Sequence, residues 1–133
     1  MRVWIWLWCV TLEATSWNAF KNGFLTITLE SNLLACVIVP TDHVSHPFVA
    51  HAPTMRVPMN IQGTDHVYLA MWAALTAVHR HNRSESRQIQ SVACPGLGTG
   101  TGGMDSLEAA LQLCLAYEHH RRVPQFINPS FAQ

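Results

Sequence analysis

The sequence predicts a single α/β domain, and three observations support this. Apolar runs with the length of strands alternate with segments whose apolar residues recur at helical spacing. A glycine-rich stretch joins the last of these strands to the last helix. The chain has 133 residues, which suits one domain with a moderate core. We therefore expect helices layered on a sheet.

The predicted elements follow one another with short connections. They are two strands at 33–39 and 46–52, a helix from Thr64–Asp65 to about His79, a strand at 89–94 and a helix from Asp105 to Arg121. The first run is apolar throughout and stops at Pro40, as expected of a strand covered on both faces. A polar turn at 82–87 is expected to separate the first helix from the third strand.

The last helix has signals at both ends. Asp105 and Glu108 have the spacing of a capping box at its start. His119 and His120 are placed to complement the negative end of the helix dipole. The apolar residues of this helix are expected on its inner side, namely Leu107, Leu111, Cys114, Leu115 and Tyr117.

The first ten residues allow two interpretations. One arginine followed by a short apolar stretch, with small residues after it, could be a signal peptide over residues 1–16. Alternating Trp4, Trp6 and Trp8 instead suit a hydrophobic first strand, which is the interpretation we favour. The stretch is too short to span a membrane.

Composition excludes several classes of partner. Eight basic and eight acidic side chains balance, so no basic surface indicates nucleic acid, and no membrane association is expected. The four cysteines are scattered without a CxxC pair, which favours reduced thiols and a cytoplasmic or nuclear protein. His43, His46 and His51 flank a strand without a helical ligand motif, so we expect no metal.

The glycine-rich stretch 96–103 carries most of the functional information. Glycine lets successive backbone N–H groups turn toward an anion, and the following helix directs its positive end to the same place. Gly98, Gly100 and Gly103 match the dinucleotide fingerprint, but too little chain follows them to complete that unit. A P-loop is excluded because Met104 and Asp105 stand where lysine and serine or threonine would be needed. A loop that only permits a tight turn remains the structural alternative.

From about Leu33 to Tyr117 the chain resembles a macro domain, the ADP-ribose-binding module. The resemblance is carried by two motifs in the correct order, His51-Ala-Pro-Thr-Met-Arg-Val-Pro58 and Pro95-Gly-Leu-Gly-Thr-Gly-Thr-Gly-Gly-Met104. It implies a three-layer α/β/α arrangement around a mixed sheet. It also implies an ADP-ribose or ADP-ribosylated ligand, or a related nucleotide diphosphate, without a cofactor.

The resemblance assigns ligand-binding positions by their place in the motifs. Gly98, Thr99, Gly100, Thr101 and Gly102 would face the diphosphate, and Gly103 and Met104 would edge the distal ribose. The full predicted ligand-binding set is Pro53, Thr54, Pro95, Gly96, Leu97, Gly98, Thr99, Gly100, Thr101, Gly102, Gly103 and Met104. Many macro domains have an aromatic residue near the ribose, and Gly102 and Met104 stand there instead.

Residues 1–32 do not match the earlier macro-domain motif, a second glycine-rich loop. Codons for residues 1–7, read in another frame, can encode Ala-Gly-Val-Asp-Leu-Ala, which resembles that motif. We therefore expect an atypical N-terminal segment at 1–32, as an out-of-frame or mis-spliced start. It would precede a macro-domain-like region at 33–122 and a tail at 123–133, so that the sheet is incomplete at its N-terminus.

These observations favour an ADP-ribose-binding module, truncated and weakened by the missing loop. Three alternatives remain open at the level of sequence: a poorly folded or partner-dependent fragment without catalysis, an ADP-ribosyl hydrolase, and a fragment of a dinucleotide oxidoreductase. The catalytic residues and the oligomeric state are not predicted.

Overall fold

The structure is a computed structural model that describes residues 4–8, 35–41, 43–44 and 46–122. Its strands are β1 (Trp4–Trp8), β2 (Val37–Pro40), β3 (Phe48–His51) and β4 (Ser91–Ala93), and its helices are α2 (His66–Ser84) and α3 (Ser106–Arg121). Most of the predicted N-terminal segment and the predicted tail at 123–133 lie outside the described residues.

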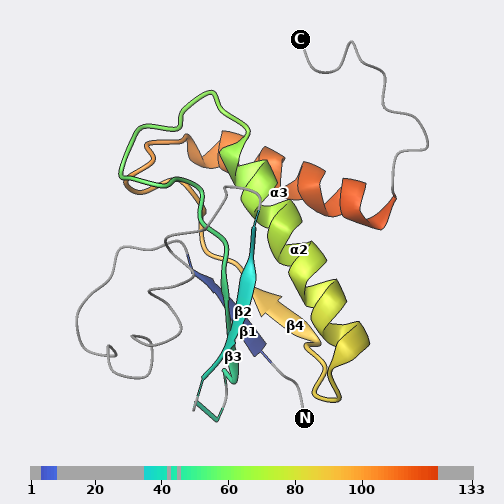
Figure 1. The fold of residues 1–133 in the computed structure, drawn as a ribbon. Helices are drawn as coiled ribbons and strands as arrows, with labels where there is room; N and C mark the ends of the chain where they lie inside the picture. The colour runs from blue at the N-terminus through green and yellow to red at the C-terminus, as the bar shows by residue number, and fades with distance from the viewer. Residues whose placement is uncertain (1–3, 9–34, 42, 45, 123–133) are drawn as a thin grey trace.

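The four strands form one mixed sheet in the order β2-β3-β1-β4 (Figure 1). β1 runs parallel to both of its neighbours, with Ile5 opposite Phe48 of β3 and Val92 of β4. β2 runs antiparallel to β3. The tryptophan-rich segment is therefore a central strand, which confirms the interpretation of residues 4–8 as extended chain.

The strands of the α/β domain lie where the sequence predicts them, but they are shorter. The third predicted strand, 89–94, is reduced to Ser91–Ala93. Ile89 instead joins the strand to the end of α2: its N–H donates to Asn82 Oδ1 at 2.7 Å and its carbonyl accepts from Asn82 Nδ2 at 2.9 Å. Asn82 can make these bonds because α2 continues past His79 to Ser84, so the predicted polar turn begins later than expected.

The helices α2 and α3 pack on each other, and α3 crosses the first half of α2 (Figure 1). Gln112 of α3 connects them: its Oε1 accepts from the Tyr68 N–H at 3.1 Å and its Nε2 donates to the Thr64 carbonyl at 2.6 Å. Asp65 stands at the N-cap as predicted, but its side chain makes no capping bond. The Tyr68 N–H in the first turn of α2 is instead bonded to Gln112 of α3.

A core of small and medium apolar residues lies between the sheet and the helices. β3 contributes Phe48 and Ala50, α2 contributes Val67, Ala70 and Ala74, α3 contributes Ala109, and the loops contribute Ala52, Ile61, Ile89, Leu97 and Met104. The alanines of both helices lack bulky side chains, so the helices can approach closely. The three-layer arrangement remains a prediction.

The predicted inner face of α3 is wrong. Leu107, Leu111, Leu115 and Tyr117 are exposed, as is Cys114. The face toward α2 carries Ala109, Gln112 and Ala116 instead, because small residues and one bridging amide fit this close contact better than leucine. The most hydrophobic side of α3 is therefore not the side that is buried.

Three of the four cysteines fall within the described residues, and all three are free. Cys36 is half-buried, and burial raises the pKa of its thiol to about 12. Cys94 is exposed. Cys9 lies outside the described residues.

No helix in the described part of the chain is both long and apolar enough to cross a membrane.

Candidate ligand-binding loop

The glycine-rich stretch forms a compact loop between β4 and α3. Two backbone hydrogen bonds close it: the Gly103 N–H donates to the Gly100 carbonyl at 3.0 Å, and the Met104 N–H donates to the Gly98 carbonyl at 3.1 Å. Thr99 Oγ1 donates to the Gly96 carbonyl at 2.9 Å. The loop thus holds its shape through its own backbone and one threonine hydroxyl.

Two of the glycines have no room for a side chain. Gly98 has φ +74°, and a Cβ there would lie 2.8 Å from Val67 Cγ2 and 2.9 Å from Ile61 Cδ1. A Cβ at Gly102 would lie 2.5 Å from the Gly98 carbonyl oxygen. Any side chain at either position would push the loop away from the structure beneath it.

Ile61 is the residue on which this loop rests. It is fully buried, and its N–H donates to the Gly102 carbonyl at 2.9 Å. Ile61 belongs to the loop before α2, so the loops that precede the two helices run side by side (Figure 1). Thr64 fixes the same segment by donating through Oγ1 to the Ile61 carbonyl at 2.6 Å.

The outer side of the glycine loop is open. A Cβ built at Gly100 meets nothing within 4 Å, and Gly100, Thr101 and Gly103 are all exposed. The N–H groups of Gly100 and Thr101 donate to no backbone carbonyl among the described residues. The loop therefore presents main-chain donors to solvent on a surface free of side-chain bulk at Gly100.

The predicted ligand-binding residues divide into two groups by exposure. Pro95, Gly96, Gly100, Thr101 and Gly103 are exposed, and Thr99 and Pro53 are half-buried. The buried positions are Leu97, Gly98, Gly102, Met104 and Thr54. Leu97 and Met104 belong to the core and anchor the two ends of the loop in it, and Thr54 is fully buried.

The start of α3 differs from the expectation that its N–H groups face the ligand. Asp105 Oδ2 accepts from the Leu107 N–H at 2.8 Å and from the Glu108 N–H at 3.3 Å, which is one half of the predicted capping box. The reciprocal bond from the Glu108 side chain does not form among the described residues, and Glu108 Oε1 accepts from Gln112 Nε2 at 3.4 Å instead. The two helix N–H donors are satisfied within the protein, and the Asp105 carboxylate adds negative charge beside the loop. An anion would therefore use the loop amides rather than these helix amides.

The histidines that raised the question of a metal do not converge. The His43 and His46 rings lie 5.0 Å apart before β3, whereas His51 ends that strand and is buried. Desolvation lowers the pKa of His51, which favours its neutral form. No group of three potential metal ligands occurs within the described ranges.

Sequence reasoning missed the residues that support the loop. Ile61 lies in a polar stretch where Val57 and Met59 are equally apolar but exposed, so hydrophobicity does not single it out. Gln112 reads as an ordinary polar helix residue. Only the contact between the two helices gives it a role.

The fold and this loop define a class of protein, namely an α/β domain in which a compact glycine-rich loop joins a strand of a mixed sheet to a helix. A family model described as the Macro domain matches residues 29–113. The match covers more than half of the chain and includes both loops that meet at Ile61, so the chain belongs to the macro domain family and the resemblance is confirmed. A search of curated proteins found no significant match.

Proposed function

We propose that this chain binds ADP-ribose, an ADP-ribosyl group or a related nucleotide diphosphate at residues 99–103. Macro domains are ADP-ribose-binding modules at the level of the family. The observation that carries the proposal is the open side of the glycine loop, where the N–H groups of Gly100 and Thr101 donate to no backbone carbonyl of the described residues and Gly100 leaves room for a ligand.

The energetics favour a diphosphate at this place. Each hydrogen bond from a backbone N–H to a charged oxygen contributes about 1.5–3 kcal/mol. The loop is held by Ile61 and by its own turns, so little ordering is required on binding. Asp105 opposes an anion through its charge, although its carboxylate is engaged with the helix N-terminus.

We propose that the chain binds this ligand without hydrolysing it, and more weakly than a macro domain that has both glycine-rich loops. A macro domain with two glycine-rich loops holds the diphosphate from two sides, and residues 1–32 provide no counterpart of the first loop in their sequence. Hydrolysis would require an additional group that positions water, and residues 99–103 are all threonine or glycine. The free thiols of Cys36, Cys94 and Cys114 support a location inside the cell.

Calorimetric titration of the full chain with ADP-ribose, ADP and NAD tests the proposal. The key variant is Gly100→Glu, because position 100 has open space and does not have the positive φ of Gly98 and Gly103. This change adds a negative charge to the anion site without disturbing the packing below it. Ser86→Glu is the matched control, since it adds the same charge on an exposed turn beyond the far end of α2.

We expect ADP-ribose to bind the parent chain and the Ser86→Glu variant equally, and binding to Gly100→Glu to weaken at least tenfold, which corresponds to about 1.4 kcal/mol. Unchanged melting temperatures will show that all three proteins are folded. Undiminished affinity of the folded Gly100→Glu variant contradicts the site. A folded parent chain that binds neither ADP-ribose nor ADP contradicts the function, and a preference for NAD supports the dinucleotide alternative.

A further inference from the structure

Asn60 lies against the glycine-rich loop, although it belongs to the segment before α2. A Cβ built at Gly103 would have three atoms of Asn60 as its nearest neighbours, with Nδ2 at 3.4 Å, Cγ at 3.7 Å and Oδ1 at 3.9 Å. Asn60 and Gly103 are both exposed. The side chain of Asn60 therefore lies at the surface of the loop, where a side chain at position 103 would otherwise project.

The amide of Asn60 is oriented by the protein. Its Oδ1 accepts from the Gln62 N–H at 2.8 Å. A backbone N–H can bond only to the oxygen of a side-chain amide, so this contact fixes which end of the amide is the nitrogen. Nδ2 donates to no group among the described residues. Asn60 thus presents two N–H donors beside Gly103, with their position set before a ligand arrives.

The main-chain donors of the glycine loop are unevenly distributed. The N–H groups of Gly103 and Met104 are bonded to carbonyls within the loop. Those of Gly100 and Thr101 donate to no backbone carbonyl in the described part of the chain. Nδ2 of Asn60 therefore supplies donors at the end of the loop where Gly103 and Met104 have none to offer.

The two groups of donors are close enough to serve one ligand. Gly100 and Gly103 are the first and last residues of a turn closed by a hydrogen bond of 3.0 Å. Their Cα atoms are therefore less than about 7 Å apart. A diphosphate with one phosphate on the N–H groups of Gly100 and Thr101 can extend its second phosphate toward Gly103 and Asn60. A monophosphate has no second group to place there.

We propose that Asn60 is a ligand-binding residue whose Nδ2 donates to the second phosphate of a diphosphate. The first phosphate of that ligand lies on the N–H groups of Gly100 and Thr101, so the site selects diphosphates over monophosphates. This inference rests on the proposed function and adds to it a residue from a second loop. A hydrogen bond to a charged oxygen is worth about a factor of ten in affinity or more.

Titration of the full chain with ADP, AMP and ADP-ribose, followed by two-dimensional ¹H–¹⁵N NMR, tests the inference on the parent chain. The side-chain amide signals of Asn60 are identified by their absence from the spectrum of the Asn60→Asp variant. We expect these signals to shift with ADP and with ADP-ribose, and to stay in place with AMP. We also expect ADP to bind at least tenfold more tightly than AMP.

Two variants separate the donor of Asn60 from its structural bond. Asn60→Ser keeps an oxygen that can accept from the Gln62 N–H but removes the N–H donors, so ADP should bind about tenfold more weakly and AMP should change by less than about twofold. Asn60→Asp also keeps the acceptor and adds a negative charge, so the loss for ADP should exceed about tenfold.

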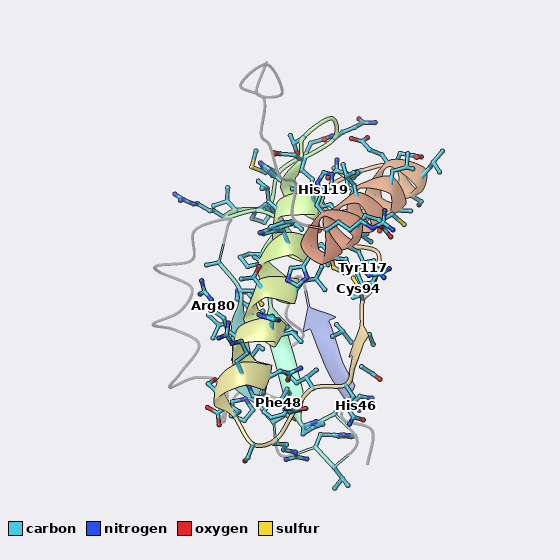
Figure 2. The ribbon with its side chains drawn as sticks, turned by 90° about the vertical axis from the view of Figure 1, so that its right-hand side faces the viewer. His46, Phe48, Arg80, Cys94, Tyr117 and His119 are labelled. Carbon is cyan, nitrogen blue, oxygen red and sulfur yellow. The ribbon has the colours of Figure 1, made fainter. Side chains whose placement is uncertain are left out.

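Arg80→Gln is the matched control for charge, because it lowers the net charge by the same one unit as Asn60→Asp. Arg80 is exposed and lies about 20 Å along α2 from the start of the helix. Figure 2 shows it on the half of α2 away from the two loops. We expect this variant to keep the parent ratio of ADP to AMP affinity. Unchanged melting temperatures will show that all the variants are folded.

The outcomes distinguish this inference from the proposed function. If Gly100→Glu weakens ADP binding but Asn60→Ser keeps the parent ratio of ADP to AMP affinity, the function stands and the role of Asn60 is overturned. A loss in Asn60→Ser that is confined to ADP-ribose would place Asn60 on the sugar and overturn it too. So would Asn60 amide signals that do not shift with ADP. A folded parent chain that binds neither ADP nor ADP-ribose overturns both proposals.

Discussion

Gly98→Ala provides a test of how the glycine loop is built. Gly98 has φ +74°, and holding an L-residue in that left-handed region costs about 1–2 kcal/mol. The new Cβ would also lie 2.8 Å from Val67 Cγ2 and 2.9 Å from Ile61 Cδ1. Overpacking of this kind costs about 1–3 kcal/mol. Together the two terms predict a loss of about 2–5 kcal/mol from the free energy of unfolding, out of a total of about 5–15 kcal/mol for an ordinary domain.

Urea unfolding followed by tryptophan fluorescence measures this loss through the transition midpoint. The matched control is Gly100→Ala, two residues along the same loop, where a Cβ meets nothing within 4 Å and φ is not positive. We expect that variant to differ from the parent chain by no more than about 0.5 kcal/mol. If Gly98→Ala and Gly100→Ala are equally stable, Gly98 is not packed on Ile61 and the geometry of the loop is wrong.

Three further predictions concern the helices. Gln112→Leu removes the two hydrogen bonds that Gln112 makes to the start of α2, so the free energy of unfolding should fall by about 1–3 kcal/mol in chemical denaturation, and no loss would contradict the bridge. Asp105→Ala removes the cap of α3 and should cost about 1 kcal/mol, whereas Asp105→Ser should recover most of it in the same assay. The pKa of His120 is lowered by desolvation and then by the charge of His79, so His79→Gln should raise it in an NMR titration. Because the folded state binds the His120 proton less readily than the unfolded state, the unfolding free energy should fall as pH drops below 6.5, and a flat profile in the parent chain would contradict this.

The sequence was most informative where one local signal decides the structure. Asp105 caps α3 as predicted, because its carboxylate needs only the two N–H groups that follow it. The alternating tryptophans predict extended chain at residues 4–8, and the strand is there. Its position between β3 and β4 was not predictable from the same residues, since pairing depends on strands far along the chain.

The sequence was less informative where a residue's burial depends on the contact between two elements. Leu107, Leu111 and Leu115 of α3 are exposed because the close contact with α2 selects Ala109 and Ala116, a choice that the hydrophobicity of one helix does not reveal. The same limit applies to the glycine loop. Its glycines stand out in the sequence, but part of the reason that Gly98 and Gly102 have no room for a side chain is Ile61, which lies in another loop and would be 2.9 Å and 2.8 Å from a Cβ at these two positions.

The place of β1 in the sheet has a consequence for synthesis on the ribosome. Trp4–Trp8 is made before the strands that flank it, which are Phe48–His51 on one side and Ser91–Ala93 on the other. Until residue 93 has been made this tryptophan-rich stretch has no second neighbour, and its open edge is available to other nascent chains. The time between making residue 8 and residue 93 is therefore the interval in which a chaperone would protect this protein most.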